Sequence, residues 1–485
     1  MERNHTMMQF FEWHVEPDGT HWNRLKQLAP ILKEKYIDSV WIPPVTKGLS
    51  KDDNGYGAYD LYDLGEFDQK GTVRTKYGTK EELLEALQAC RELGIGVYVD
   101  VVMNHKAGAD ETELFSVIEV NPLDRTEEIS EPFTIEGWTK FTFPGRGNRY
   151  SHFTWSFEHF NGTDYDAKSG RTGVFRILGD YKDWNKNVDH EFGNYDYLMF
   201  ANIDYNHPDV RKEMIRWGKW LADTLQCNGF RLDAIKHIHY DFIHEFTKEM
   251  LKHCGENFYL VGEFWKSDLT VCQEFLSQTD YQIDIFDVQL HFHFYSASKA
   301  GRQFDLRTIF DQTIVQAHPL HAVTFVDNHD SQPNEALESW VEDWFKPIAY
   351  ALILLRKDGY PCVFYGDYFG IGGPEPIPSI QNKIDPLLYA RFHKAYGDQR
   401  DYFDHPNIIG WVRHGTGEFP DSGCAVVLSN GDHGEKRMFV GEHRRGEVWI
   451  DLTNNRPERI LIEENGFATF PVNGRSVSVW AHKGV

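Results

Sequence analysis

The sequence predicts an α/β protein: a (β/α)8 barrel with a domain inserted after its third strand and an antiparallel β-sandwich at its C-terminal end. Three observations predict this fold. Short apolar runs alternate with amphipathic helices, a long polar and aromatic stretch breaks that alternation, and the last part of the chain contains only short strand-like runs. Alternation of strand and helix is typical of a parallel sheet, and eight strands fit a closed barrel.

Eight apolar runs, each short enough for one strand, are the candidate barrel strands. They cover residues 8–13, 37–43, 96–103, 230–235, 258–264, 285–288, 322–327 and 361–366. Between them, residues 81–93, 208–225 and 241–252 place apolar side chains at helical spacing. No GxGxxG turn and no Walker loop joins a strand to a helix, which favours a barrel over an open nucleotide-binding sheet.

Two changes of character divide the chain into three predicted domains. Residues 105–206 are rich in Gly, Asp, Asn and aromatic residues, and a connection of that length needs structure of its own. The last region has strand-like runs at 408–412, 424–428, 437–440, 447–450 and 476–480. We therefore expect a barrel from residues 1–104 and 207–396, an inserted domain at 105–206, and a C-terminal β domain at 397–485.

Composition and charge exclude several classes of protein. Apolar residues make up 41% of the chain and charged residues 26%, which is ordinary for a globular protein. The longest apolar run, 348–355, is far shorter than the ~18–20 residues of a membrane-spanning helix. The formal net charge of −24 repels phosphate backbones and anionic membranes, so neither nucleic acid nor a membrane is an expected partner.

The cysteines and the first residues of the chain indicate the cellular compartment in which we expect the protein. The six cysteines are scattered without a CxxC pair, so the sequence has no zinc signature and no dense disulfide framework. No basic segment followed by an apolar core precedes the first predicted strand, so no secretion signal is visible. We expect a cytoplasmic monomer, or a secreted protein if a signal was removed before Met1.

Four predicted strands end in polar clusters, which lie at residues 100–105, 229–237, 262–265 and 325–330. The carboxyl ends of barrel strands are where (β/α)8 enzymes carry their chemistry. In the second cluster Arg231 and Asp233 are two residues apart, so they project to the same side of the strand. A guanidinium beside Asp233 favours its ionised form, which an attacking nucleophile needs.

The third cluster provides a carboxyl group in a different setting. Glu263 follows Gly262 and precedes Phe264 and Trp265, and apolar surroundings raise the pKa of a carboxyl so that it keeps its proton. Two carboxyls with opposite settings, ~5–5.5 Å apart, are what retaining glycoside hydrolysis requires. One such cluster alone is more often a turn or a helix cap, but four of them on barrel strands indicate one active site.

These four clusters, in this order and spacing, resemble the four signature regions of the α-amylase family of glycoside hydrolases. Further segments, at residues 55–67, 143–147, 193–199 and 402–405, are similar to the bacterial liquefying α-amylases, so the resemblance covers nearly the whole chain. It implies a catalytic TIM barrel, a domain B after strand 3 and a C-terminal β-sandwich. It also implies an endo-acting, retaining hydrolase of α-1,4 bonds in starch, glycogen or maltodextrins.

The resemblance implies a role for several residues of the clusters. Asp233 is the implied nucleophile and Glu263 the implied general acid/base. Asp330 is the implied third carboxylate, which binds hydroxyls of the sugar ring and favours its distorted conformation. Arg231 would orient Asp233. The implied substrate-binding residues are Trp13, Tyr56, His105, Arg231, Lys236, His237, Trp265 and His329.

The resemblance also implies calcium between the barrel and domain B. Asn202 and Asn206 stand where the secreted relatives have aspartate, so the site loses two negative charges. We expect one weakly bound calcium, and a second site that is empty or holds sodium; the alternative is a domain B held by side-chain contacts alone. All the implied ligands offer oxygen, which suits calcium. They are Asn104, Asp196, Asn202 and the backbone carbonyl of His237, with Asp164, Asp183 and Asp204 as a neighbouring cluster.

Two histidines outside these clusters resemble a metal pair. His291 and His293 alternate along residues 290–294, which is the period of a strand. No third ligand is evident nearby, so we interpret them as ordinary residues of a strand.

Two other functions stay open on the sequence. A transglycosylase or an α-1,6-acting relative would use the same scaffold. Residues 199–204 resemble neither the 1,6-glucosidase nor the neopullulanase pattern, which favours plain α-1,4 hydrolysis. A non-catalytic glucan-binding protein would need to lack a catalytic carboxylate, and all three are present.

Overall fold

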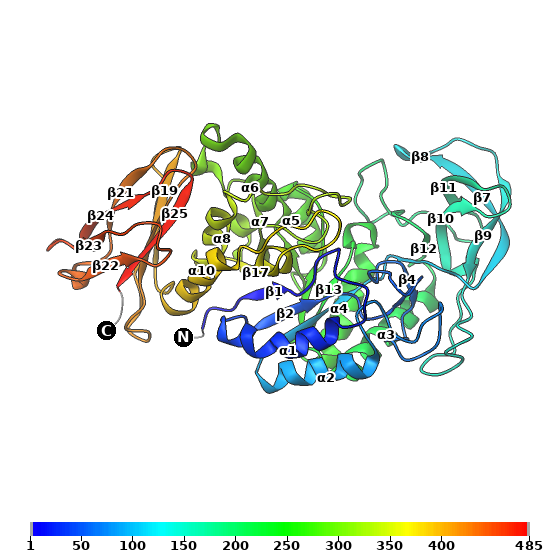
Figure 1. The fold of residues 1–485 in the computed structure, drawn as a ribbon. Coiled ribbons are helices and arrows are strands. Elements are labelled where there is room, and N and C mark those ends of the chain that lie inside the picture. The colour runs from blue at the N-terminus through cyan, green and yellow to red at the C-terminus, as the bar shows by residue number, and fades with distance from the viewer. Residues whose placement is uncertain (1–2, 483–485) are drawn as a thin grey trace.

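A computed structural model describes residues 3–482 of the chain. Its centre is a barrel, with the cyan sheet of the inserted region on one side and the orange-to-red C-terminal strands on the opposite side (Figure 1). Within residues 3–482 no helix combines the length and the apolar composition that crossing a bilayer requires.

Eight parallel strands close the barrel, in the spatial order β1-β17-β16-β15-β14-β13-β5-β2. They are β1 (Met7–Gln9), β2 (Ser39–Ile42), β5 (Gly96–Val101), β13 (Gly229–Leu232), β14 (Tyr259–Gly262), β15 (Asp284–Phe286), β16 (Ala322–Phe325) and β17 (Tyr360–Phe364). Each strand overlaps one of the eight predicted runs, so the predicted barrel is confirmed. Most of their residues are buried, which is why parallel strands read as continuous apolar runs.

Helices connect the barrel strands and cover them on the outside. The described α-helices are α1 (His21–Glu34), α2 (Lys80–Glu92), α3 (Pro208–Leu225), α4 (Tyr240–Cys254), α5 (Leu269–Gln278), α6 (Val288–Ala300), α7 (Ile314–Ala317), α8 (Lys346–Leu354), α9 (Tyr365–Phe369) and α10 (Gln381–His393). The three predicted helices correspond to α2, α3 and α4. Local signals fix their starts: Thr79 and Glu82 form a capping box at α2, and Pro208 is the first residue of α3.

The prediction of a strand at residues 290–294 is wrong, because these residues lie in α6. The Asp287 side chain accepts a hydrogen bond from the backbone N–H of Leu290 (3.1 Å) and so caps the helix. His291 is buried and bonded through both ring nitrogens, to the Val326 carbonyl and the Ser339 hydroxyl (2.7 Å each). A short apolar run does not distinguish strand from helix by its period alone.

The inserted region forms an antiparallel sheet of its own, in the order β6-β12-β10-β11-β7-β8 with β9 on β7. Its strands are β6 (His105–Lys106), β7 (Glu111–Asn121), β8 (Asp124–Glu128), β9 (Phe133–Lys140), β10 (Phe160–Asp166), β11 (Arg171–Ile177) and β12 (Ala201–Ile203). A short pair, β3 (Lys47–Gly48) and β4 (Ala58–Asp60), precedes it in the chain. The sheet follows β5, so it stands beside the carboxyl ends of the barrel strands.

The C-terminal strands are antiparallel and form two sheets, β18-β19-β20-β25-β22-β23 and β21-β24. They are β18 (Gln399–Tyr402), β19 (Ile408–Arg413), β20 (Cys424–Ser429), β21 (Gly434–Phe439), β22 (Val448–Asp451), β23 (Arg459–Leu461), β24 (Phe467–Val472) and β25 (Ser476–His482). The predicted antiparallel β domain is confirmed. One face of its larger sheet packs in a separate apolar cluster with the smaller sheet, and the other face belongs to the core of the barrel.

Candidate active site

One cleft gathers the predicted site residues at the carboxyl ends of the barrel strands. Its volume is about 500 Å³. Asp233 and Glu263 follow β13 and β14, and Asp330 follows β16. Of the eleven residues predicted for catalysis and substrate binding, ten line the cleft: Trp13, Tyr56, His105, Asp233, Lys236, His237, Glu263, Trp265, His329 and Asp330.

The eleventh residue, Arg231, lies under the floor of the cleft and is fully buried. Its Nη1 donates to Asp233 Oδ1 (2.6 Å) and to both oxygens of Asp100 (3.1 and 3.0 Å). Its Nη2 is 3.3 Å from Glu263 Oε2. One guanidinium therefore contacts both of the carboxyls that the reaction requires and fixes their relative position.

The backbone after β13 also holds Glu263. Ala234 has φ of +50°, a left-handed conformation that costs a non-glycine residue of order 1 kcal/mol. In this conformation its N–H donates to Glu263 Oε2 (3.0 Å). A Cβ at Gly262 would overlap the end of the buried Ile235 side chain, so glycine allows the two loops to approach closely. Local strain and a missing side chain thus bring the two carboxyl-bearing strand ends together.

Burial raises the pKa of all three carboxyls. For Asp233 the effect of burial exceeds the opposing effect of Arg231, and the pKa rises to about 6. For Glu263 burial again raises the pKa, with Arg231 opposing and the charge of Asp233 adding to the rise. Burial and then the neighbouring Glu263 hold the pKa of Asp330 well above its ordinary value. Arg231 does favour ionised Asp233, as expected, but burial has the larger effect.

Asp330 lies beside a histidine whose tautomer the structure defines. Gln9 Nε2 is a donor only, so its contact with His329 Nδ1 (3.0 Å) leaves the ring hydrogen on Nε2. That nitrogen is 3.4 Å from Asp330 Oδ2. Burial lowers the pKa of His329 well below its ordinary value, so the ring is neutral and can donate to a carboxylate or a hydroxyl.

A wall of nearly parallel rings borders the cleft on the side of β1. The ring planes of Trp13, Tyr56 and His329 lie within 14° of one another, with centroids 5.2–6.0 Å apart. The Trp13 backbone N–H donates to Gln332 Oε1 (3.1 Å), and Gln332 Nε2 donates to buried Glu12 (3.2 Å). This pair joins the loop after β1 to the loop that carries Asp330.

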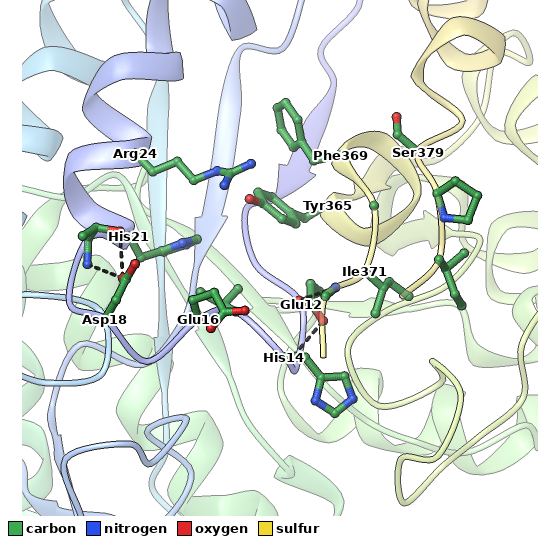
Figure 2. Close-up of a pocket in the computed structure, with 16 residues that line it drawn as sticks. Glu12, His14, Glu16, Asp18, His21, Arg24, Tyr365, Phe369, Ile371 and Ser379 are labelled. Atoms are coloured by element: carbon green, nitrogen blue, oxygen red, sulfur yellow. Dashed lines mark hydrogen bonds between the residues drawn. The ribbon is translucent and has the colours of Figure 1, made fainter. Parts of the chain in front are cut away.

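Glu12 also borders a second cavity of about 340 Å³, which shares no lining residue with the cleft. Figure 2 shows Glu12 and His14 on one side of this cavity and Tyr365 and Phe369 on the other. The Glu12 carboxylate accepts the N–H of His14 (2.7 Å) and of Gly372 (3.2 Å). Its role is therefore to hold loops around the cleft.

The opposite side of the cleft carries Lys236, His237 and Trp265. The His237 Nδ1–H donates to the Tyr195 carbonyl (2.7 Å), which leaves Nε2 as an acceptor. Lys236 donates to the Trp265 carbonyl (3.2 Å). His105 also lines the cleft, and its Nε2 contacts the Tyr56 carbonyl (2.8 Å) while its Nδ1 contacts the Asn104 amide (3.2 Å).

Asp100 and Tyr195 are among the residues at the site that had no predicted role. Asp100 is buried and accepts from Arg231, from the Tyr56 hydroxyl (2.8 Å) and from the Trp41 indole (3.0 Å). Tyr195 lines the cleft, and its ring lies edge-on to His237 with centroids 4.2 Å apart. Both lie inside segments that carry the resemblance, 100–105 and 193–199, which is the signal that points to them.

Of the residues expected to hold calcium at the first site, two are in direct contact with each other. Asn202, on β12, donates its amide to Asp196 Oδ1 (3.2 Å), so these two are in contact. The Asn104 amide nitrogen lies 3.2 Å from His105 Nδ1. His237 is a residue of the cleft.

The expected second cluster is not assembled. Asp183 is half exposed and pairs with Arg176 (2.7 Å), Asp204 is 3.5 Å from the Lys182 ammonium, and Asp164 accepts the N–H of Phe200 (3.2 Å). Within residues 3–482, no three His, Cys, Asp or Glu side chains are placed to hold one metal ion. The three aspartates of the second cluster therefore do not fit one calcium ion, and Asn104 and Asn202 of the first site bring no negative charge to it.

Comparisons with known proteins extend over the whole chain. The family model described as the alpha amylase catalytic domain matches residues 25–404. The glucan 1,4-alpha-maltohexaosidase of Bacillus sp. (strain 707) is 53% identical over 481 residues, which are 99% of this chain and 93% of the relative. The cytoplasmic alpha-amylase of Escherichia coli (strain K12) is 45% identical over 491 residues, 99% of each chain.

A likeness to solved structures supports the same fold. The alpha-amylase of Geobacillus thermoleovorans, solved in complex with acarbose, matches with a TM-score of 0.67. The match covers 99% of this chain and 98% of the other, at 16% identity. At that identity the likeness shows the fold alone.

Proposed function

Because the chain belongs to the α-amylase family of glycoside hydrolases, we propose that it is an endo-acting α-amylase that cleaves α-1,4 bonds with retention. The substrates are starch, glycogen or maltodextrins. The observation that carries this proposal is the contact of buried Arg231 with Asp233 and Glu263 under an aromatic-walled cleft. Flat rings suit the C–H faces of sugars, and paired carboxyls suit cleavage of an acetal.

The mechanism has two displacements. In the first, Asp233 attacks the anomeric carbon and forms a glycosyl ester, while Glu263 gives its proton to the departing glycosidic oxygen. In the second, Glu263 takes a proton from water, the water oxygen bonds to the anomeric carbon, and the ester to Asp233 breaks. The raised pKa of Glu263 supports its role as the proton donor, and Arg231 supports the ionised form of Asp233.

The position of the two carboxyls supports retention rather than inversion. Both contact nitrogens of one guanidinium, at 2.6 and 3.3 Å, and the two carboxyls are close enough to hydrogen-bond to each other. A retaining pair stands ~5–5.5 Å apart, whereas an inverting pair needs ~6.5–9.5 Å to admit a water molecule between acid and base. Asp330, with His329 beside it, would bind hydroxyls of the sugar at the cleavage point.

The remaining substrate-binding residues all line the cleft, which supports the roles proposed for them. Trp13 and Tyr56 would stack on sugars on the β1 side of the cleft. Lys236, His237 and Trp265 would bind the sugars of the departing side. We propose further that residues 1–104 with 207–396 form the catalytic barrel, residues 105–206 its domain B and residues 397–485 a domain C.

The cytoplasm is the proposed location. All six cysteines are free thiols, and four of them are buried, which suits a reducing compartment. A relative of similar length carries the name cytoplasmic alpha-amylase. The proposed partner is the glucan substrate alone, bound by a monomer.

The first experiment compares Asp233→Asn and Glu263→Gln with Glu92→Gln, an exposed carboxylate of α2. The two cleft variants should lose several orders of magnitude in kcat and keep their circular dichroism spectra and unfolding midpoints. The Glu92 variant should retain full activity. Near-normal turnover in either cleft variant would show that the roles are assigned wrongly.

Early products distinguish the proposed activity from its rivals. Soluble starch should shorten quickly while pullulan, whose α-1,6 bonds need a different enzyme, stays intact. Glucose released one unit at a time, cleavage of pullulan, or longer chains formed from short maltodextrins would favour an exo-acting, α-1,6-acting or transglycosylating enzyme instead.

A further inference from the structure

Asp196 is a buried carboxylate whose hydrogen-bonding sites are all filled by the protein. It is 1% exposed, near the contact between domain B and the barrel. It accepts the backbone N–H of Asn185 (2.8 Å) and the amide nitrogens of Asn185 (2.9 Å), Asn161 (2.7 Å) and Asn202 (3.2 Å). An ionised carboxylate has about four lone-pair sites, so these four donors satisfy it without a cation.

The asparagines that surround Asp196 also bind one another and the backbone. We call Asn161, Asn185 and Asn202 the amide cage. Asn202 Nδ2 donates to Asn161 Oδ1 (2.8 Å), and Asn161 Nδ2 donates to the Asp183 carbonyl (3.2 Å). The cage therefore joins β10, β12 and the loop between β11 and β12, the segments that carry most of the expected calcium ligands of domain B.

A lysine ammonium takes a position of the kind that a second cation would take. The Lys182 side chain is 8% exposed, and its Nζ donates to the carbonyls of Glu158 (2.8 Å) and Phe160 (2.6 Å). It is 3.5 Å from Asp204 Oδ2. Two carbonyl oxygens and a carboxylate form a set of hard donors that suits calcium, but here the chain supplies its own positive charge.

We propose that the amide cage and the Lys182 ammonium replace bound calcium, so that domain B keeps its own fold without a divalent cation. This inference does not depend on the proposed function, because it concerns the folded chain alone. The oxygens left in the cage for an ion, Asn185 Oδ1 and Asn202 Oδ1, are buried and neutral. Neutral oxygens repay little of the cost of removing water from a doubly charged ion.

The first test measures metal content and thermal unfolding of the full chain. The protein is equilibrated with calcium chloride, freed of unbound ions by gel filtration and analysed for calcium by elemental analysis. Its unfolding midpoint is then compared in calcium chloride and in EDTA at equal ionic strength. We expect no calcium bound in stoichiometric amount and equal midpoints. One calcium or more per chain, or a lower midpoint in EDTA, would overturn the proposal, because ligands that bind only the folded state raise its stability.

The second test restores negative charge to the cage. The triple variant Asn161→Asp, Asn185→Asp and Asn202→Asp should bind calcium, and its unfolding midpoint should fall in EDTA and recover in calcium chloride. The control is Asn121→Asp at the end of β7, outside the cage, whose midpoint should not respond to calcium. If the triple variant does not fold even with calcium, the wild-type measurements decide alone.

Lys182→Met tests the ammonium separately. Methionine keeps a long apolar stem and removes the charge, so Asp204 loses its cation. The unfolding midpoint should fall equally in EDTA and in calcium chloride. A variant as stable as the wild type in EDTA would contradict the role given to Lys182.

Discussion

Among single residues, Arg231 has the central position in the active site, because its guanidinium contacts several buried carboxylates. Asp100, Asp233 and Glu263 each lie within 3.3 Å of its guanidinium nitrogens. Burial and the negative charge of Asp100 raise the pKa of Asp233, Arg231 lowers it, and the result is about 6. Asp100 therefore holds Arg231 in place and also makes Asp233 a stronger base.

The pH dependence of kcat/KM follows from this balance. The nucleophile must be ionised, so the rate should fall as the pH drops through about 6, where Asp233 takes up a proton. Asp100→Asn removes a negative charge from behind Asp233, so the pKa of Asp233 should fall and the acidic limb should move to lower pH. Rate profiles on a soluble maltooligosaccharide measure the shift.

A matched substitution separates charge from general damage. Asp110→Asn changes a partly buried carboxylate that binds the Tyr59 hydroxyl instead of Arg231, and it should leave the acidic limb in place. An Asp100 variant whose acidic limb stays fixed or moves to higher pH would contradict the electrostatic role of Asp100.

The sequence predicted that Arg231 and Asp233 lie together, but it did not predict that Asp100 lies beside them. Arg231 and Asp233 could be paired because both lie on one strand, where a spacing of two sets the same direction. Asp100 lies on the neighbouring strand. The register of β5 against β13 places it opposite Arg231. Such a register is a property of the closed barrel and has no local signature.

At the level of secondary-structure elements, a buried network of ion pairs supports the loop after β16. Lys346, the first residue of α8, donates to Asp327 (2.7 Å) and to Asp367 on α9 (2.5 Å). Asp327 also accepts the hydroxyl of Ser331 (2.8 Å), on the loop that carries Asp330. Burial raises the pKa of Asp327 to about 7, with Lys346 opposing, so the network depends on that one ammonium.

Lys346→Met should therefore destabilise the fold and weaken catalysis together. It leaves two carboxylates buried without their cation, which typically costs about 3–5 kcal/mol of unfolding free energy. Loss of the ammonium should also loosen the loop that carries Asp330 and lower kcat. Urea unfolding and kcat measure the two effects.

The control for this substitution is Lys212→Met on α3, whose side chain is 78% exposed and whose change should cost almost nothing. Replacing Asp327 and Asp367 by Asn in the Lys346 variant should restore part of the stability, because no buried charge then lacks a partner. An unchanged urea midpoint in Lys346→Met would show that the network contributes no stability.

Elements differ in how far the sequence predicts them. The barrel strands were predicted because they are continuous apolar runs, and α2, α3 and α4 because their apolar residues recur at helical spacing. β23 and β24 were missed: β23 has three residues, and β24 contains Pro471, which is unusual within a strand. The amide cage could not be predicted, because the hydrogen bonds from Asn161, Asn185 and Asn202 to Asp196 depend on the folded arrangement and have no local signature.

At the scale of the whole molecule, one apolar core extends from the barrel into the C-terminal sheet. The same cluster of buried residues contains Leu354 and Leu355 at the end of α8 and Ile409 and Trp411 of β19. The Trp411 indole donates to the Leu355 carbonyl (3.3 Å). The order of the three domains could be predicted from the sequence, but this shared face could not, because its residues read only as ordinary strand interior.

The shared core predicts that the barrel and the C-terminal domain unfold together. Trp411→Ala removes a fully buried ring at their contact and should lower the unfolding free energy by about 3–5 kcal/mol, while KM stays unchanged because the cleft lies at the other end of the barrel. Trp138→Ala, at a 47% exposed position on β9, is the matched control and should cost far less. Denaturant unfolding followed by tryptophan fluorescence and by circular dichroism should give one coincident transition at a lower midpoint for the Trp411 variant. Two separate transitions, with the barrel unfolding at the wild-type midpoint, would mean that the C-terminal domain contributes no stability to the barrel.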